Sequence, residues 1–437
     1  MDKIIALCKR RGFVYAGSEI YGGLSNSWDY GPLGTELKNN IKAAWWKRFV
    51  HMRDDIVGLD AALIMNPKVW EASGHLENFT DPLIECEVCN TRVRADDLEA
   101  KKQHEDKHKG ENTNFTGWTD PKMFNLMFKT FIGPTEESAN IAYLRPETAQ
   151  SMFVNFKRVL ETNRVRIPFG IAQIGRAFRN EITPGNFIFR TREFEQMEIE
   201  YFIAPPKSDS EWQEVFEMWR HEMISWMKDD LGLDMSKVHE LDVPESDRAH
   251  YSKRTIDFEY DFPFGTKELY GLAYRTDFDL ANHQKHSGAN LTYKDSETGE
   301  EYIPHVVEPT WGVDRSCLAV LSNSYSEENG RVVLRLPRSL APYKAAVFPL
   351  VANKPELMAR AKEIYAMLKK QFVVAFDDRG NIGKRYAAQD EIGTPFCITI
   401  DYETLEANSV TVRYRDSGMQ ERVNVDKLLQ HLSQQFV

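Results

Sequence analysis

The chain has 437 residues, a length that predicts two or three domains. Hydrophobic residues make up 42% and charged residues 28%, which excludes a globally disordered protein; the longest apolar run, Ala345–Ala352, is far too short for a membrane helix. The net charge of −11 argues against a protein that coats nucleic acid by charge alone.

The N-terminal residues Met1 to Arg11 carry charges where a secretory signal needs an apolar run, so we expect no signal peptide and a cytoplasmic location. The cysteines are few and odd in number: Cys8, Cys86, Cys89, Cys317 and Cys397. We therefore expect reduced thiols rather than a disulfide framework.

Two of these cysteines belong to a candidate metal site. Cys86 and Cys89 are followed by His104 and His108 in the spacing C-x2-C-x14-H-x3-H, which lies in the range of zinc knuckles. The alternative is a solvated, charged helix over Asp96–Lys109 that contains two histidines by chance. Zn²⁺ is thus a candidate cofactor that the metal content of the protein would test.

Residues 1–340 contain strand-like runs separated by helical stretches. The runs are Met123–Ile132, Phe169–Glu181, Phe194–Phe202 and Tyr270–Phe278. This irregular order predicts an α+β domain built on a mainly antiparallel sheet. Two hydrophilic stretches, about residues 80–120 and 207–254, interrupt the runs and are predicted to be insertions in this domain.

The run Phe169–Glu181 carries small residues and then Arg179 and Glu181 on one face, which leaves room for a ligand. The hairpin loop that follows, Asn180–Arg192, is rich in turn-forming residues and has arginines near its end. Arginines on such a loop are suited to binding phosphate.

A strand over Phe194–Phe202 has two unlike faces. One face carries an aromatic ring, an amide and two carboxylates: Phe194, Gln196, Glu198 and Glu200. An aromatic ring beside carboxylates can stack a base and hold an ammonium group or a metal ion. The alternative is an exposed polar face with one stray phenylalanine.

The segment from Glu308 to Arg315 is predicted to be a strand that turns at Gly312 into a helix. Arg315 would lie in the first helical turn, where its guanidinium and the helix N-terminus can meet phosphate oxygens. The alternative is that Arg315 is an ordinary surface residue.

From residue 341 onward, strands and helices alternate, which predicts a compact α/β domain over residues 341–437. The predicted strands are Lys344–Val351, Phe372–Asp377, Pro395–Asp401, Val410–Arg415 and Glu421–Val425, and the predicted helices are Glu356–Lys370, Ile382–Gln389 and Asp426–Gln435. This domain has 13 Lys and Arg against 12 Asp and Glu, so residues 1–340 carry a net charge of −12.

Five segments, in chain order, resemble the single-chain, homodimeric glycyl-tRNA synthetases of class II. Arg179–Glu181 with Arg190–Phe194 is similar to class II motif 2, and Gly312–Arg315 is similar to motif 3. The other three similar segments are Tyr21–Gly34, Arg145–Gln150 and Arg275–Leu280. The resemblance covers nearly the whole chain.

The resemblance implies a class II catalytic domain over residues 1–340 and an anticodon-binding domain over residues 341–437. The implied reaction activates glycine with ATP to glycyl-adenylate and then transfers glycine to the 3′ end of its tRNA, without editing. The implied partners are glycine tRNA, glycine, ATP and a second copy of the chain, with no membrane. In this family the stretch Trp28–Pro67 forms the dimer interface, although an ordinary core would equally use an aromatic-rich helix there.

The resemblance also assigns an ATP site. Arg179, Glu181 and Arg315 would be catalytic: Arg179 would hold the α-phosphate, Glu181 would read adenine stacked on Phe194, and Arg315 would cover the base or the γ-phosphate. The implied ATP-binding residues are Arg179, Asn180, Glu181, Phe189, Arg190, Thr191, Arg192, Glu193, Phe194, Glu268, Leu269, Gly312, Val313, Asp314 and Arg315. Glu268 and Glu308 would bind Mg²⁺.

Glycine has no side chain, so its pocket must hold the ammonium and carboxylate groups and exclude a methyl group from the α-carbon. The resemblance implies Arg94 for the carboxylate and, around the rest of glycine, Glu147, Phe194, Gln196, Glu198, Glu308, Thr310 and Gly312. Exclusion by size makes an editing site unnecessary. Two positions depart from the family pattern: Thr310, where Ser is usual, and Trp311, where a small or aliphatic residue is usual.

In the C-terminal domain, RNA phosphates would meet the basic pairs Lys384–Arg385 and Arg413/Arg415. Two other functions stay open. A non-catalytic relative that binds RNA would have lost the catalytic arginines, and a synthetase for another small amino acid would differ at the pocket glutamates. Amino-acid-dependent exchange between ATP and pyrophosphate separates the three.

Overall fold

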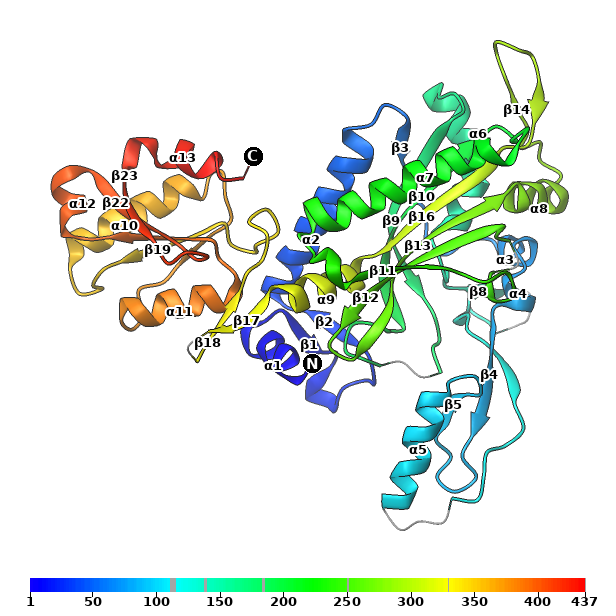
Figure 1. Ribbon diagram of the computed structural model, residues 1–437, viewed down its shortest axis with the longest axis horizontal. Coiled ribbons are helices and arrows are strands. Elements are labelled where there is room, and N and C mark those ends of the chain that lie inside the picture. The colour runs from blue at the N-terminus through cyan, green and yellow to red at the C-terminus, as the bar shows by residue number, and fades with distance from the viewer. Residues whose placement is uncertain (111–114, 137–139, 183–184, 250, 329, 437) are drawn as a thin grey trace.

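The computed structural model describes residues 1–110, 115–136, 140–182, 185–249, 251–328 and 330–436. Figure 1 shows a large body that holds the N-terminus and a smaller body, drawn in orange and red, that holds the C-terminus. A seven-stranded sheet organises the large body, and the smaller one has a five-stranded sheet of its own. Among the described residues, no helix has both the length and the apolarity needed to cross a membrane.

The large sheet confirms the predicted antiparallel architecture. Its strands, in spatial order, are β11 (Val238–Asp242), β12 (Arg254–Phe262), β13 (Gly265–Thr276), β16 (His305–Gly312), β10 (Glu193–Ile203), β9 (Phe169–Phe178) and β3 (Ile56–Gly58). All neighbours pair antiparallel except β3 and β9, which are parallel. Strands β9, β10 and β13 overlap three of the four predicted runs.

Three helices cover one face of this sheet: α2 (Pro32–Trp46), α7 (Asp209–Ser225) and α9 (Val313–Ser324). From β10, the side chains of Met197, Ile199 and Tyr201 enter the core beneath these helices, as the alternation of the strand predicts. Trp45 and Trp311 are fully buried in the same core. The alternate side chains of β10, including Gln196 and Glu198, therefore point to the other face of the sheet, where a ligand can bind.

Helix α7 lies within the hydrophilic stretch 207–254, which was predicted to be an insertion. Its side chains Trp212, Phe216, Trp219 and Met223 are nevertheless part of the main core. The apolar residues occupy one stripe of a helix whose other faces are charged, so average composition conceals them. This stretch also supplies the edge strand β11.

Two helices, α6 (Ala149–Asn163) and α8 (Phe278–Ser287), pack on the opposite face of the sheet, over Phe169 and Phe202. The remaining part of that face, around Phe194 and Thr310, borders a cavity. The sheet thus separates an aromatic core on one side from a ligand-sized space on the other.

A small three-stranded sheet projects from the large body, drawn in blue and cyan in Figure 1. It consists of β5 (Arg92–Arg94), β4 (Thr80–Glu85) and β6 (Lys122–Asn125), with helix α5 (Leu98–Gly110) beside it. The predicted single strand Met123–Ile132 is wrong, because it divides into β6 and β7 (Lys129–Phe131), which belong to different sheets. Leu126 and Met127 are adjacent and both buried, which breaks the alternation that a continuous strand would need.

The remaining elements of the large body are short. They are α1 (Asp2–Arg11), β1 (Val14–Ala16), β2 (Trp28–Tyr30), α3 (Lys68–Ala72), α4 (His75–Asn78), β8 (Ile141–Tyr143), β14 (Tyr293–Lys294), β15 (Glu301–Tyr302), β17 (Tyr325–Glu328) and β18 (Arg331–Leu334). Beyond β3, Ile64 forms an isolated antiparallel bridge with Leu144.

The smaller body confirms the predicted α/β domain. Its strands, in spatial order, are β20 (Val374–Phe376), β19 (Ala345–Pro349), β21 (Phe396–Ile400), β22 (Ser409–Tyr414) and β23 (Gln420–Asn424). Its helices are α10 (Pro355–Leu368), α11 (Ile382–Ile392), α12 (Tyr402–Ala407) and α13 (Val425–Ser433). Residues of these elements form a hydrophobic core separate from that of the large body.

Candidate active site

A cavity of about 340 Å³ lies on the open part of the large sheet. Strands β10, β12, β13 and β16, the loop before β10 and the start of α9 contribute to its walls. Sixteen of the predicted site residues line it: Glu147, Arg179, Glu181, Phe189, Arg190, Thr191, Phe194, Gln196, Glu198, Glu268, Leu269, Glu308, Thr310, Gly312, Asp314 and Arg315. The fold therefore brings together residues from three of the five similar segments.

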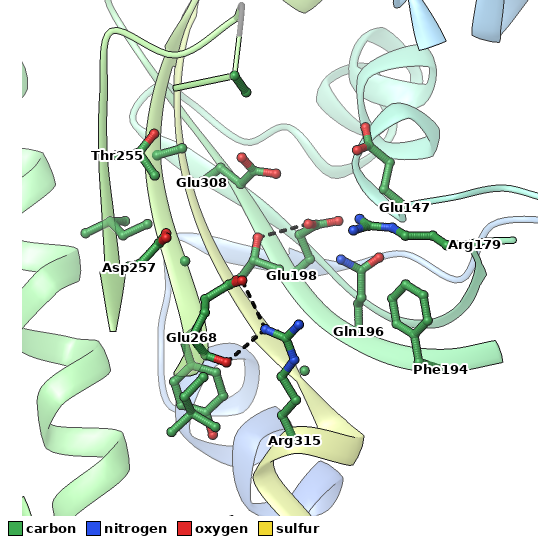
Figure 2. Close-up of a pocket in the computed structure, with 18 of the residues that line it drawn as sticks. Glu147, Arg179, Phe194, Gln196, Glu198, Thr255, Asp257, Glu268, Glu308 and Arg315 are labelled. Atoms are coloured by element: carbon green, nitrogen blue, oxygen red, sulfur yellow. Dashed lines mark hydrogen bonds and ion pairs between the residues drawn. The ribbon is translucent and has the colours of Figure 1, made fainter. Parts of the chain in front are cut away.

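One part of the cavity is defined by guanidinium groups on aromatic rings, and we call it the arginine half (Arg179, Arg315, Phe189, Phe194 and Glu268). The Arg179 guanidinium lies 5.3 Å from the centre of the Phe194 ring, and that of Arg315 lies 4.5 Å from the Phe189 ring. Figure 2 shows Arg179 and Phe194 on one side of this space and Arg315 with Glu268 on the other. Such cation–π pairs hold flat cations in place without using up their hydrogen-bond donors.

The arginines of this half are anchored lightly. Arg179 Nε donates to the carbonyl of Pro146 at 3.0 Å, and Arg315 Nη1 lies 3.1 Å from the Glu268 carboxylate. The side chain of Glu268 is 49% exposed. Arg315 beside it holds the pKa of Glu268 below its ordinary value, so this carboxylate is ionised.

The other part of the cavity is defined by buried carboxylates, and we call it the carboxylate half (Glu147, Glu198, Glu308, Thr310 and Arg275). Glu198 accepts hydrogen bonds from Thr310 Oγ1 at 2.9 Å and from the hydroxyl of Thr148. Both oxygens of Glu308 accept from Arg275 Nη1 at 3.0 Å. These contacts fix the direction of two carboxylates on neighbouring strands.

The carboxylates of this half differ in their ionisation. Burial and the nearby Glu147 raise the pKa of Glu198, and burial raises that of Glu308 to about 8 in spite of Arg275. Burial acts on Glu147 too, but His75 and Arg275 hold its pKa below the ordinary value. Glu147 is therefore the carboxylate of this half that stays charged.

Glu200 continues the same face of β10 beneath the cavity. Its register places it opposite Glu308 on β16, and its side chain is fully buried. Within the described part of the chain, neither carboxylate oxygen has a hydrogen-bond partner. Burial, together with Glu308, raises its pKa well above the ordinary value, so Glu200 is neutral.

Several residues of this site have roles that sequence reasoning did not assign. Arg275 was flagged only as part of a similar segment; it is buried and bonds Asp279 as well as Glu308. Arg275 lies near the end of β13 and Asp279 in the first turn of α8, so the signal from which this ion pair could have been found is an arginine and an aspartate four residues apart across a strand-to-helix junction. Asp257 and Tyr251, which also line the cavity, give no comparable signal in the sequence.

Five predicted site residues do not line the cavity. Asn180, Arg192 and Glu193 face a second cavity of about 1040 Å³ on the far side of the β9–β10 connection, and Val313 is fully buried in the main core. Arg94 ion-pairs with Asp81 and Asp96. The structure therefore does not bring the predicted contact for the glycine carboxylate into the cavity.

Asp314 lines the cavity but is already engaged by the protein. It accepts hydrogen bonds from Tyr30 Oη at 2.5 Å, Lys38 Nζ at 3.0 Å and the backbone N–H of Glu195 at 2.8 Å. This carboxylate ties α2 and β2 to the start of α9. Its contacts are those of an anchor for Arg315 rather than of a ligand for ATP.

The candidate metal residues converge as their spacing predicts. Cys86 Sγ lies 3.5 Å from His108 Nε2, Cys89 Sγ lies 3.4 Å from His104 Nε2, and the two Nε2 atoms are 3.1 Å apart. All four donor atoms lie within 4.8 Å of one another. The cluster is on the projecting β4–β5–β6 unit, away from the cavity (Figure 1).

The basic residues predicted to contact RNA have other partners in the smaller body. Arg385 is buried and donates to the carbonyl of Pro349, and Arg415 is buried and donates to the carbonyls of Gly393 and Leu336. Arg413 makes two hydrogen bonds to Asp390. The prediction is therefore wrong for Arg385 and Arg415, because sequence shows a charge but not its burial.

Two known families match the chain. The family described as "tRNA synthetase class II core domain (G, H, P, S and T)" matches residues 130–324, and the one described as "Anticodon binding domain" matches residues 344–435. The first range includes the strands β10, β12, β13 and β16 that line the cavity.

Similar proteins match along the whole chain. One is a "Glycine--tRNA ligase" from Alkaliphilus oremlandii, 51% identical over 465 residues, covering 100% of this chain and 98% of the relative. Another, from Clostridium tetani, is 51% identical over 466 residues and covers 99% and 98%. A third, from Thermobifida fusca, is 49% identical over 460 residues and covers 100% and 98%.

Proposed function

Because the chain belongs to the class II glycine–tRNA ligases, we propose that the cavity on the large sheet is where it joins ATP and glycine into glycyl-adenylate. The observation that carries this proposal is the contrast between the two walls of one cavity. The two arginines and two aromatic rings of the arginine half, with Arg190 beside them, suit a nucleoside triphosphate, and three buried carboxylates suit a small ammonium ion.

In this proposal the arginine half binds ATP. Adenine stacks on Phe194, Glu181 reads its amino group, and Arg315 covers the base or reaches the γ-phosphate. Arg179 holds the α-phosphate, and Arg190 assists at the phosphates. The cation–π contacts of Arg179 and Arg315 favour these positions, because they leave guanidinium donors directed into the cavity.

Glycine supplies its own nucleophile, since its carboxylate is ionised at neutral pH. The carboxylate oxygen attacks the α-phosphorus of ATP, the bond to the bridging oxygen breaks, and pyrophosphate leaves. No general base is required, so the chain contributes alignment of the two substrates and stabilisation of the charge on the α-phosphate. In the second step the 3′-terminal hydroxyl of tRNA attacks the carbonyl of the adenylate and AMP leaves.

The carboxylate half holds glycine and excludes larger amino acids. Glu147, Glu198 and Glu308 surround the ammonium group, and Thr310 closes the floor. Hydrogen bonds hold the three carboxylates and the threonine hydroxyl to the protein, so an added methyl group meets groups that cannot move aside. This exclusion by size makes an editing site unnecessary.

Glu268 is the residue that best fits Mg²⁺. It offers an ionised, half-exposed carboxylate at the edge of the arginine half, and Mg²⁺ prefers oxygen ligands. When bound, the ion would neutralise negative charge on the ATP phosphates. Glu308 fits less well, because both of its oxygens accept from Arg275. We therefore assign Glu308 to glycine.

The test of the activity is amino-acid-dependent exchange of pyrophosphate into ATP, measured with each of the twenty amino acids. We expect exchange with glycine and little with alanine or serine. The absence of glycine-dependent exchange would contradict the proposed cavity. Alanine-dependent exchange at a comparable rate would contradict the proposed pocket.

We further propose that Cys86, Cys89, His104 and His108 bind Zn²⁺. In a tetrahedral ZnS₂N₂ site with ordinary bond lengths, sulfur and nitrogen ligands lie about 3.5 Å apart and two nitrogens about 3.3 Å apart. The distances of 3.5, 3.4 and 3.1 Å fit this geometry. A turn in which Asn90 N donates to the carbonyl of Cys86 at 2.9 Å sets the two cysteines side by side.

Elemental analysis of the purified protein tests the zinc site. We expect one zinc per chain in the wild-type protein and loss of zinc in the Cys86→Ser variant. Cys397→Ser, a substitution of a buried cysteine in the other body, is the matched control and should keep its zinc. Less than about 0.2 zinc per wild-type chain would rule out a structural metal.

A homodimer is proposed from exposed apolar residues. The apolar face of α2, including Trp45, is buried in the core of its own chain, so it is not the dimer surface. Three apolar side chains are exposed: Tyr21 (87%), Leu24 (65%) and Ile64 (49%). Leu24 and Leu144 line the same cavity, and Ile64 forms a β-bridge with Leu144, which connects the three into one patch. A second copy would cover this patch. Light scattering should give twice the mass of one chain, and Tyr21→Glu should lower it.

The remaining assignments follow from the proposed reaction. The proposed domain boundary lies near residue 341, between Leu340 of the first core and Ala345 of the second; Ile392 of α11 packs on the first core from across this boundary. The smaller body receives the anticodon of glycine tRNA, and the cytoplasm, where ATP and tRNA are found, is the proposed location. Binding of glycine tRNA by the chain, compared with binding of an alanine tRNA, tests the partner.

A further inference from the structure

We propose that His75 and Gln150 are positioning residues that fix the Glu147 carboxylate before glycine binds. The inference rests on the proposed role of Glu147 in holding the glycine ammonium group. Neither residue lines the cavity, so each acts through Glu147 rather than on the substrate.

His75 reaches one oxygen of Glu147. Its Nε2 lies 3.3 Å from Glu147 Oε2, and its Nδ1 lies 2.8 Å from the hydroxyl oxygen of Ser73. A lone pair on Nε2 would be repelled by the carboxylate. Nε2 therefore carries a proton, whether Nδ1 donates to Ser73 or accepts from it.

The His75 ring has little freedom to turn away. It is 7% exposed and lies between two aromatic rings, 5.6 Å from that of Trp70 and 5.4 Å from that of Phe79. Asn125 also holds the backbone at this point by donating to the carbonyl of His75. The direction of the Nε2 proton is thus set by packing and not by the substrate.

Gln150 reaches the other oxygen. Its Nε2 donates to Glu147 Oε1 at 3.0 Å and to Asp279 at 2.9 Å, and its Oε1 accepts from His283 Nε2 at 2.8 Å. Burial lowers the pKa of His283 to about 4, so His283 is neutral and its Nε2 proton faces Gln150. Two carboxylates on one side and a donor on the other leave one orientation for the amide.

The two donors therefore restrain both oxygens of Glu147 from opposite sides. A carboxylate next to Glu198 would otherwise favour the protonated form, since like charges in a buried site repel. With His75 and Gln150 in place, Glu147 remains ionised and its free lone pairs point into the cavity. Loss of either donor should weaken the binding of glycine and leave that of ATP unchanged.

The test uses the full chain in glycine-dependent ATP–pyrophosphate exchange. In His75→Leu, we expect KM for glycine to rise by about tenfold or more, because a hydrogen bond to a charged group is lost, while KM for ATP stays within about twofold. Gln150→Met keeps the volume of the side chain without its donor and should behave alike. His75→Gln places an amide N–H near the position of Nε2 and should restore most of the affinity.

His221→Leu is the matched control, because His221 is exposed on α7, on the other side of the sheet. An unchanged KM for glycine in both His75→Leu and Gln150→Met overturns the inference. So does a parallel loss of glycine and ATP affinity, or a His75→Gln variant as impaired as His75→Leu. If the wild-type chain shows no exchange with glycine, the proposed function itself fails, which is a different outcome.

Discussion

The two halves of the cavity are built in opposite ways. In the carboxylate half, Arg275 is 1% exposed and bonds Glu308 and Asp279, and Glu198 is held by two threonine hydroxyls. In the arginine half, the side chain of Arg315 is 25% exposed and its partner Glu268 is 49% exposed. A small ligand meets a wall already assembled, whereas a polyphosphate meets charged groups that can still move onto it.

The comparison between the two halves predicts that a substitution in the arginine half causes the largest loss of pyrophosphate-exchange activity. Arg179→Ala should reduce kcat/KM for pyrophosphate exchange by about 10²–10³-fold, because a charged donor near the α-phosphate is removed from the transition state. Arg176→Ala, a change of an exposed arginine on β9 three residues before Arg179, is the control. Exchange that survives Arg179→Ala at full rate would falsify the role of Arg179.

A change in the carboxylate half should instead separate the two substrates. Glu147→Gln removes the charge that faces the ammonium group and places an amide against the donors of His75 and Gln150. We expect KM for glycine to rise by about 10- to 100-fold with KM for ATP little changed. An equal rise for both substrates would show that the halves are not independent.

Asp257 lines the same cavity as the arginine half, where Arg315 offsets only part of the effect of its burial. Burial and the nearby Glu268 and Glu259 raise the pKa of Asp257 from 3.8 to about 7. Between those pH values the unfolded chain has lost the proton and the folded chain keeps it. The stability contributed by Asp257 is therefore complete below about pH 4 and lost as pH rises through 7.

Asp257→Asn should remove this dependence. Relative to wild type, the variant should gain about 1 kcal/mol of unfolding free energy by pH 7 and nothing near pH 4, with partial exposure reducing the effect. Urea unfolding at a series of pH values measures it. A difference between the two proteins that does not vary with pH would show that Asp257 titrates normally.

The smallest effect on glycine binding is expected from a substitution at Thr310, the floor of the carboxylate half. Thr310→Ser keeps the hydroxyl that donates to Glu198 and removes only a methyl group. KM for glycine should stay within about twofold, and discrimination against alanine should fall by less than about tenfold. A complete loss of discrimination would mean that the methyl group, and not the carboxylates, excludes alanine.

Sequence reasoning found the face of β10 because alternation in a strand requires no knowledge of its neighbours. It puts Gln196 and Glu198 on one face of the strand and Met197 on the other; in the structure the first two line the cavity and Met197 lies in the core. The strand predicted at Met123–Ile132 failed because a break in a strand depends on what lies beside it. Asn180 donates to the carbonyl of Leu126 at 2.7 Å, a contact from a distant part of the chain.

Charged residues show the same limit. The sequence predicts RNA phosphate contacts for Arg385 and Arg415, but their guanidinium groups are buried and donate to backbone carbonyls. Arg94 was given a substrate role that its pairing with Asp81 and Asp96 does not support. His75 was not singled out at all, because a lone histidine in a sequence carries no sign of the carboxylate it will meet.

Thr310 and Trp311 are consecutive residues of β16 that point to opposite sides of the sheet. Thr310 bonds Glu198, while the Trp311 ring lies 4.8 Å from that of Phe49 and 5.4 Å from that of Trp45. One peptide unit is all that separates the selective surface from the packed interior. Attempts to widen the pocket for other amino acids should therefore begin at Thr310. A smaller residue at Trp311 would leave a cavity in the core, so the strand would shift and glycine itself would bind less well.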